Sequence, residues 1–128
     1  MLAAPPAAPT RPLSTVWEIY WDSSFTGSSA GVGIIIARAG GPALVSASVP
    51  VKGTDATHVE ALGPPLAALL VTTRLPPCRV AFFGDSANVV NLLAATTVPY
   101  DLYLFNCWEL TRDLLSDSSF TATWIPRD

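Results

Sequence analysis

Apolar residues in the first half of the chain form three runs that are separated by Gly/Ser or Pro/Gly breaks. Residues 15–25 carry apolar or aromatic side chains on both alternating sets, which is typical of a central strand covered on both faces. Residues 28–40 follow a Gly/Ser turn and contain a β-branched run, and residues 42–53 alternate small polar with apolar positions. The pattern predicts three successive strands arranged as a meander.

The second half of the chain alternates helical and strand-like segments. Residues 57–75 are rich in Ala and Leu and predict a helix, residues 78–86 predict a buried strand, and residues 87–96 a short helix. Residues 101–118 place apolar side chains on one stripe and charged ones opposite, as in an amphipathic helix, and residues 119–126 predict a last strand. This order predicts an α/β domain with a five-stranded mixed sheet, in which the meander is joined by parallel strands and helices lie on the faces.

Composition limits the function classes. The chain has 128 residues, of which 50% are hydrophobic and 13% charged, so it is long enough for one domain with a real core. Its net charge is −3 and its isoelectric point is about 4.9. A protein that holds nucleic acid mainly through a broad cationic surface needs many Lys and Arg, and only seven are present.

The two ends of the chain and its cysteines add further expectations. We expect a flexible Ala/Pro-rich tail over residues 1–15 and one domain over residues 16–128. The tail has neither the pattern of a secretory signal nor that of a membrane helix, which favours an intracellular protein, cytoplasmic or nuclear, that does not bind membranes. Cys78 and Cys107 form no CxxC pair or Cys/His cluster, so we expect buried free thiols and no zinc.

Three acidic residues lie at positions from which the predicted topology could bring them together. Asp22 follows the apolar part of the first strand, Glu60 lies near the start of the first helix, and Asp85 ends the fourth strand. If the first and fourth strands are adjacent and parallel, Asp22 and Asp85 lie at the same sheet edge, and Glu60 can point there from the covering helix. Clustered carboxylates stay ionised when a cation neutralises them, and oxygen ligands alone select Mg²⁺ or Mn²⁺.

Each acid also has a purely structural interpretation. Asp22 could open a hairpin turn, Thr57 and Glu60 fit a helix capping box, and Asp85 with Ser86 could cap the next helix. In that case the chain is an unrelated α/β interaction domain. The four tryptophans are expected in the core, because small apolar domains use aromatic side chains mainly for buried area: Trp17, Trp21, Trp108 and Trp124.

Several segments together resemble the ribonuclease H family. The segment YWDSSFTGSSAGVGIII resembles its first hairpin, ATHVEAL its helix-borne glutamate, and FFGDSANVVNLL its strand-ending Asp-Ser motif. The terminal FTATWIPRD resembles the last strand of the retroelement-polymerase branch. The similarity extends over residues 16–128.

The resemblance implies an endonuclease that cleaves the RNA strand of RNA–DNA hybrids with two Mg²⁺ or Mn²⁺ ions, about 3.5–4 Å apart. Asp22 would hold both ions, and Glu60 and Asp85 would each complete one coordination sphere. Substrate contacts to sugar or phosphate would come from three further side chains: Ser24, His58 and Ser86. Partners would be the hybrid and the remainder of a polymerase polyprotein.

The chain departs from the family pattern at three places. Ser23 replaces a glycine that can adopt positive φ, and the prolines of Gly63–Pro65 require the helix behind Glu60 to kink or to start later. The family's fourth carboxylate and final helix lie beyond the matched region, and Asp128 is the candidate that would substitute for that carboxylate. The absence of that fourth acid from the match, the acidic isoelectric point and the scarcity of Lys favour an alternative, a catalytically impaired docking module of a larger polymerase or ribonucleoprotein.

Overall fold

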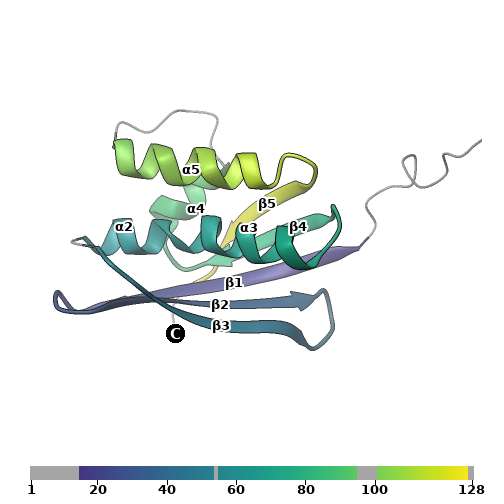
Figure 1. Ribbon diagram of the computed structural model, residues 1–128, viewed down its shortest axis with the longest axis horizontal. Coiled ribbons are helices and arrows are strands. Elements are labelled where there is room, and N and C mark those ends of the chain that lie inside the picture. Colours follow the sequence, from purple (N-terminus) through teal and green to yellow (C-terminus); the bar gives the residue numbers. More distant parts are fainter. Residues whose placement is uncertain (1–14, 54, 95–100, 127–128) are drawn as a thin grey trace, which may run out of the picture.

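The computed structural model describes residues 15–53, 55–94 and 101–126 (Figure 1). The tail predicted over residues 1–15 therefore falls, except for Thr15, outside the described residues, as does Asp128. The elements follow in the order β1 (Val16–Phe25), β2 (Ala30–Arg38), β3 (Ala43–Val51), α2 (Ala56–Ala61), α3 (Gly63–Arg74), β4 (Arg79–Gly84), α4 (Ala87–Ala94), α5 (Leu102–Leu114) and β5 (Ser119–Trp124).

The five strands form one mixed sheet in the order β3-β2-β1-β4-β5. β1, β2 and β3 pair antiparallel as a meander, whereas β4 pairs parallel to both β1 and β5. Parallel neighbours need crossover connections, which the helices between β3 and β4 and between β4 and β5 provide. The predicted α/β class and the predicted five-stranded mixed sheet are confirmed.

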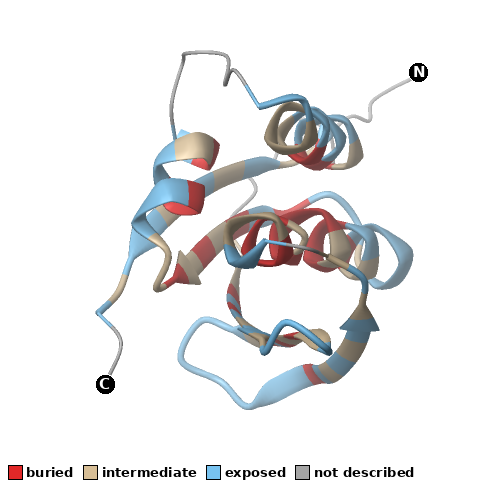
Figure 2. Ribbon diagram, turned by 90° about the vertical axis from the view of Figure 1, so that its left-hand side faces the viewer, coloured by how far each residue is buried: buried red, intermediate tan, exposed pale blue. Residues whose placement is uncertain are grey.

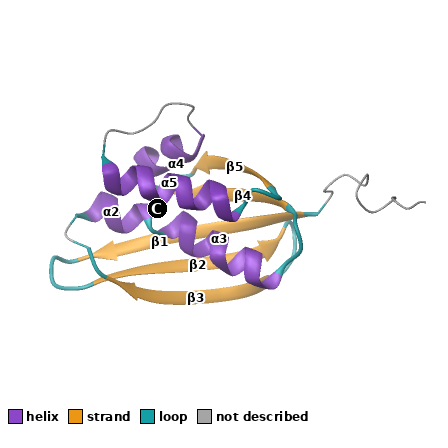
Figure 3. Ribbon diagram, turned by 45° about the horizontal axis from the view of Figure 1, so that its top comes forward, coloured by secondary structure: helices purple, strands orange, loops and turns teal. Residues whose placement is uncertain are grey.

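The described helices pack on one face of the sheet (Figure 3). Segments coloured as buried lie where these helices and the strands face one another (Figure 2). Ile19, Ile34 and Phe82 belong to this core and are at most 1% exposed. On the opposite face Tyr20 is 37% and Ile35 44% exposed. The expectation that the first strand is covered on both faces is therefore wrong for the described residues, although β1 is central.

The predicted helix over residues 57–75 is two helices. α2 ends at Ala61, Leu62 links the two helices, and α3 begins at Gly63 with prolines in its first turn. Proline has no backbone N–H to donate to the preceding turn, so the chain restarts its hydrogen bonding here. The kink expected from the Gly-Pro-Pro stretch is confirmed.

The remaining elements follow the sequence pattern, with one exception. α5 buries Cys107 and Thr111, and both Cys78 and Cys107 are buried free thiols, as predicted. Trp124 is 52% exposed because β5 is an edge strand, so its predicted place in the core is wrong. None of the described helices combines the length and apolar character needed to cross a membrane.

Candidate metal centre

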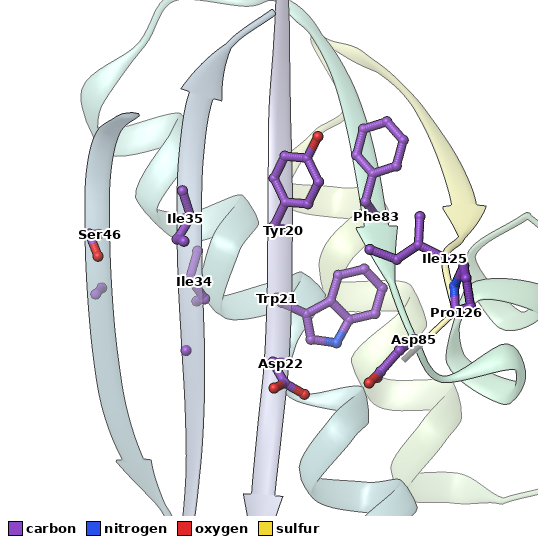
Figure 4. A pocket seen from close by; sticks show the side chains of 12 residues that line it. Tyr20, Trp21, Asp22, Ile34, Ile35, Ser46, Phe83, Asp85, Ile125 and Pro126 are labelled. Carbon is purple, nitrogen blue, oxygen red and sulfur yellow. The ribbon is translucent and has the colours of Figure 1, made fainter. Parts of the chain in front are cut away.

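The three predicted acids meet at one edge of the sheet. In the parallel β1–β4 pair, Tyr20 lies opposite Phe83, so two further residues along each strand lead to Asp22 and Asp85. Glu60 reaches the same place from the last turn of α2. One carboxylate oxygen from each acid lies within 4.8 Å of the others. Figure 4 shows the Asp22 carboxylate, which projects from β1, close to the Asp85 carboxylate, which follows the end of β4.

Asp22 does not open a turn. β1 continues to Phe25, and Asp22 lies within it, opposite Gly33 of β2. The turn comes later, where Thr26 N donates to Ser29 O at 3.0 Å. The structural interpretation of Asp22 as a turn residue is therefore wrong, and its exposed carboxylate projects from a regular strand.

Glu60 does not form a capping box with Thr57. The cap of α2 is Asp55, whose Oδ1 accepts from Thr57 N at 2.7 Å and from His58 N at 3.1 Å. The Glu60 carboxylate instead accepts a hydrogen bond from the Ser23 hydroxyl of β1. Glu60 is only 6% exposed, so its carboxyl group is buried where α2 meets the sheet edge.

Asp85 is not the residue that caps α4. The cap is Ser86, whose hydroxyl accepts from Val89 N at 3.4 Å, while its carbonyl accepts from Val90 N at 2.9 Å. Asp85 is the first residue after β4 and is half-buried. One oxygen of its carboxylate lies within 4.8 Å of carboxylate oxygens of Asp22 and Glu60.

A groove beside the acids contains two of the three predicted substrate contacts. It has a volume of about 470 Å³, and its lining includes Glu60, Asp85, Ser24 and Ser86. The third, His58, does not line it. Whether these three side chains contact a substrate remains a prediction.

His58 instead joins α2 to α5. Its Nε2 lies 2.7 Å from Oδ2 of Asp101, and its ring stacks on Tyr103 at a centroid distance of 4.3 Å. The hydrogen bond with His58 is the main reason why the pKa of Asp101 is lowered. This contact fixes the helix that carries Glu60 against its neighbour.

A second groove runs over the open face of the sheet and reaches Asp22 and Asp85. It has a volume of about 640 Å³, and Asp22 and Asp85 lie at one end of its lining (Figure 4). Tyr20 and Phe83 stack in it with ring centroids 5.0 Å apart. Burial and the Glu18 carboxylate raise the pKa of Tyr20, whose hydroxyl donates to Glu18 at 3.3 Å.

Sequence reasoning missed the residues that surround the acids. The sequence pattern identifies Ser23 only as a replacement for glycine, yet its hydroxyl donates a hydrogen bond to the Glu60 carboxylate. Its backbone raises no difficulty, because no non-glycine residue in the described part of the chain has positive φ. Trp21 donates through Nε1 to the Glu60 carbonyl and Trp124 to the Asp85 carbonyl, each at 3.1 Å. No local signal pairs residues so far apart in the chain.

The donor set fits a hard divalent cation. All three groups are carboxylates, and like charges at this separation repel unless a cation lies between them. Oxygen-only donors suit Mg²⁺ or Mn²⁺, which retain water molecules and are completed by substrate phosphates. The fourth predicted acid, Asp128, lies outside the described residues, so its role stays a prediction.

Solved structures similar to this chain are ribonucleases H. The ribonuclease H1 of the archaeon Halobacterium salinarum is 19% identical, with a TM-score of 0.78, over 88% of this chain and 86% of the other. LC11-RNase H1, solved in complex with an RNA/DNA hybrid, is 18% identical with a TM-score of 0.75, over 87% of this chain and 86% of the other.

A viral polymerase also contains a similar domain. The protease-reverse transcriptase of prototype foamy virus is 20% identical with a TM-score of 0.63, over 89% of this chain but only 18% of the viral one. No protein-family profile and no curated protein matches this chain. The element order, the sheet topology and these similarities agree, and the chain has the ribonuclease H-like fold.

Proposed function

We propose that this domain is a metal-dependent nuclease that hydrolyses the RNA strand of RNA–DNA hybrids. The observation that carries the proposal is the convergence of Asp22, Glu60 and Asp85 within 4.8 Å at the edge of a ribonuclease H-like sheet. The similarity to LC11-RNase H1, whose structure holds such a hybrid, supports the substrate class. Domains of this fold within a viral reverse transcriptase support a polymerase context.

The three carboxylates would hold one or two Mg²⁺ or Mn²⁺ ions. When bound, such ions activate the attacking water and stabilise the departing oxygen of the phosphodiester. Asp22 is exposed in the groove over the open face and Asp85 lines both grooves, so these two acids would bind on the side from which a substrate approaches. Glu60 is buried and held by Ser23, so it would fix the inner side of the site.

The groove beside the acids supplies neutral donors for the substrate. The hydroxyls of Ser24 and Ser86 lie in its lining and are suited to sugar hydroxyls or phosphate oxygens. Proteins distinguish RNA from DNA mainly through the 2′-hydroxyl, which both donates and accepts hydrogen bonds. Small hydroxyl side chains beside the carboxylates therefore fit a ribose-containing strand.

One observation favours the alternative of a docking module without catalysis. Among the described residues, neither groove beside the acids is lined by Lys or Arg. Phosphate contacts normally come largely from such side chains, so this chain alone would hold a hybrid weakly. In that case the domain would keep the fold and serve as a connecting part of a larger polymerase or ribonucleoprotein.

A cleavage assay separates the two functions. A hybrid with a labelled RNA strand is incubated with the protein in Mg²⁺ or Mn²⁺, with EDTA as the metal-free reference. We expect cleavage of the RNA strand only, and a loss of at least about 100-fold in Asp22→Asn, since a direct ligand should matter more than the 10–100-fold typical of residues behind it. Asp113→Asn, an exposed acid on α5, is the matched control and should cleave like the wild type.

The contrary results are equally specific. Cleavage that persists in EDTA or in Asp22→Asn would refute the proposed metal centre. An intact hybrid at every metal concentration, with the protein folded and metal bound, would leave the docking module as the function.

A further inference from the structure

Two tryptophans hold the backbone from which two of the acids project. Trp21 Nε1 donates to the carbonyl oxygen of Glu60, and Trp124 Nε1 donates to the carbonyl oxygen of Asp85, both at 3.1 Å. The two indoles come from β1 and β5, which lie on either side of β4. Glu60 lies in the last turn of α2, and Asp85 is the first residue after β4.

The hydrogen bond from Trp21 replaces one that the helix cannot make. In a continuous α-helix the Glu60 carbonyl accepts from the N–H four residues later, which is position 64. Pro64 has no N–H, so this carbonyl, to which the Leu62 N–H at the C-cap also donates, can take a further donor from outside the helix. The Trp21 side chain is 3% exposed and supplies that donor from inside the core. Because the indole donates to this carbonyl from a different element, it ties the last turn of α2 to β1.

Packing around Trp21 connects all three acids. A Cβ placed on Gly63 would lie 2.1 Å from Trp21 Cδ1, and one on Gly84 would lie 2.5 Å from Trp21 Cη2. The indole therefore lies directly against two glycine backbones, one just after α2 and one at the end of β4. Trp21 precedes Asp22, and Gly84 precedes Asp85. The Trp21 side chain thus lies next to Asp22 in sequence, against the glycine that precedes Asp85, and in a hydrogen bond to the Glu60 carbonyl.

Trp124 acts on Asp85 from the edge of the sheet. β4 ends at Gly84, whose carbonyl accepts from Ile125 N at 2.9 Å, and Asp85 follows in the loop before α4. The Trp124 indole is half exposed, yet its N–H is directed at the Asp85 carbonyl. This hydrogen bond fixes the backbone of Asp85, the first residue after the strand, and so limits the positions that its carboxylate can reach.

We propose that Trp21 and Trp124 are positioning residues of the acid cluster, which orient Glu60 and Asp85 through their backbone carbonyls. The inference rests on the proposed function, in which the cluster binds a divalent cation. It assigns the two indole N–H groups a role in metal affinity and not only in packing. A carboxylate on a fixed backbone loses less conformational entropy when it binds an ion, so the affinity for the ion is higher.

Metal titration of conservative variants tests the role. Trp21→Phe and Trp124→Phe keep an aromatic ring and remove the N–H. Trp108→Phe is the matched control, because Trp108 Nε1 has no hydrogen-bond partner among the described residues. The dissociation constant for Mn²⁺ is measured by calorimetry on metal-free protein that circular dichroism shows to be folded. We expect about tenfold weaker binding in each test variant, as for residues that orient metal ligands elsewhere, and no more than about a twofold change in the control.

A metal-free readout accompanies the titration. The backbone carbonyl ¹³C resonance of Glu60 should move in Trp21→Phe but not in Trp124→Phe, and that of Asp85 should show the reverse. If Trp21→Phe does not fold, benzothienylalanine at position 21 replaces the N–H by sulfur at nearly the same size. Its Mn²⁺ affinity is expected to fall in the same way.

The outcomes are distinguishable. Wild-type affinity for Mn²⁺ in folded test variants, or unchanged carbonyl resonances, would overturn the positioning role while leaving the metal centre intact. A wild-type protein that binds no Mn²⁺ would overturn the proposed function itself and, with it, the role of the two indoles in metal affinity.

Discussion

The contact between Trp21 and Gly63 leads to a prediction that runs against helix propensity. Gly63 is the first residue of α3, and alanine is favoured over glycine in helix interiors by up to about 1 kcal/mol. Propensity alone would therefore make Gly63→Ala neutral or stabilising. The structure predicts the opposite, because the new methyl group would lie 2.1 Å from Trp21 Cδ1, 2.6 Å from Cγ and 2.7 Å from Nε1.

The size of the effect follows from the packing. Three ring atoms lie inside the contact distance, and the ring is buried with Gly84 on its other edge, so Trp21 has little room to move. Overpacking of cores typically costs about 1–3 kcal/mol. The first position of a helix recovers only part of the propensity gain. We therefore expect Gly63→Ala to lower the free energy of unfolding by about 2 kcal/mol, which is about 8 °C in melting temperature for a domain of this size.

Urea denaturation of metal-free protein measures this change. Gly84→Ala should behave like Gly63→Ala, since its methyl group would lie 2.5 Å from Trp21 Cη2. Gly33→Ala is the matched control, because the nearest heavy atom to its new methyl group is 3.9 Å away, an ordinary contact. Equal stability of all three variants and the wild type would refute the described packing around Trp21.

Three further predictions concern charge and capping. Burial and, second, the charge of Asp101 raise the pKa of Cys107 to about 11. The stability that the neutral thiol contributes is therefore complete below about pH 8.5 and is lost as the pH rises towards 11. Urea midpoints of the wild type should fall over this range more steeply than those of Cys107→Ala. The hydrogen bond with His58 lowers the pKa of Asp101, so its contribution is present above about pH 3.9 and is lost as the pH falls below that value. The difference in melting temperature between wild type and Asp101→Asn should therefore shrink between pH 6 and pH 3, and a constant difference would contradict the pairing. Asp55→Ala removes the cap of α2 and should lower the free energy of unfolding by about 1 kcal/mol in urea titrations, whereas Thr57→Ala should have a smaller effect.

The convergence of the acids could be predicted because topology alone determines it. Asp22 and Asp85 end the apolar parts of two strands, and the prediction needed only that β1 and β4 be parallel neighbours, which the sheet order confirms. Their carboxylates then share an edge without any knowledge of side-chain packing. The break behind Glu60 was equally predictable, since Pro64 and Pro65 lack the donors that a continuous helix requires.

The structural partners of the acids could not be predicted, because they depend on which side chains meet in three dimensions. Asp55 and Thr57 are both good helix caps, and only the structure shows that α2 begins at the earlier one. His58 pairs with Asp101, 43 positions away, and no local pattern connects them. Trp21 and Trp124 are both tryptophans in apolar strand segments, yet Trp21 is buried in a central strand and Trp124 is half exposed on an edge strand.

Anomalous diffraction from crystals soaked in Mn²⁺ tests the central claim most directly. If Asp22, Glu60 and Asp85 are gathered to hold a divalent cation, an anomalous peak should appear between their carboxylate oxygens, which already lie within 4.8 Å of one another. The peak should be absent from Asp22→Asn crystals grown and soaked in the same way. Ordered carboxylates with no peak between them in the wild type, at Mn²⁺ concentrations that occupy other surface sites, would contradict the account.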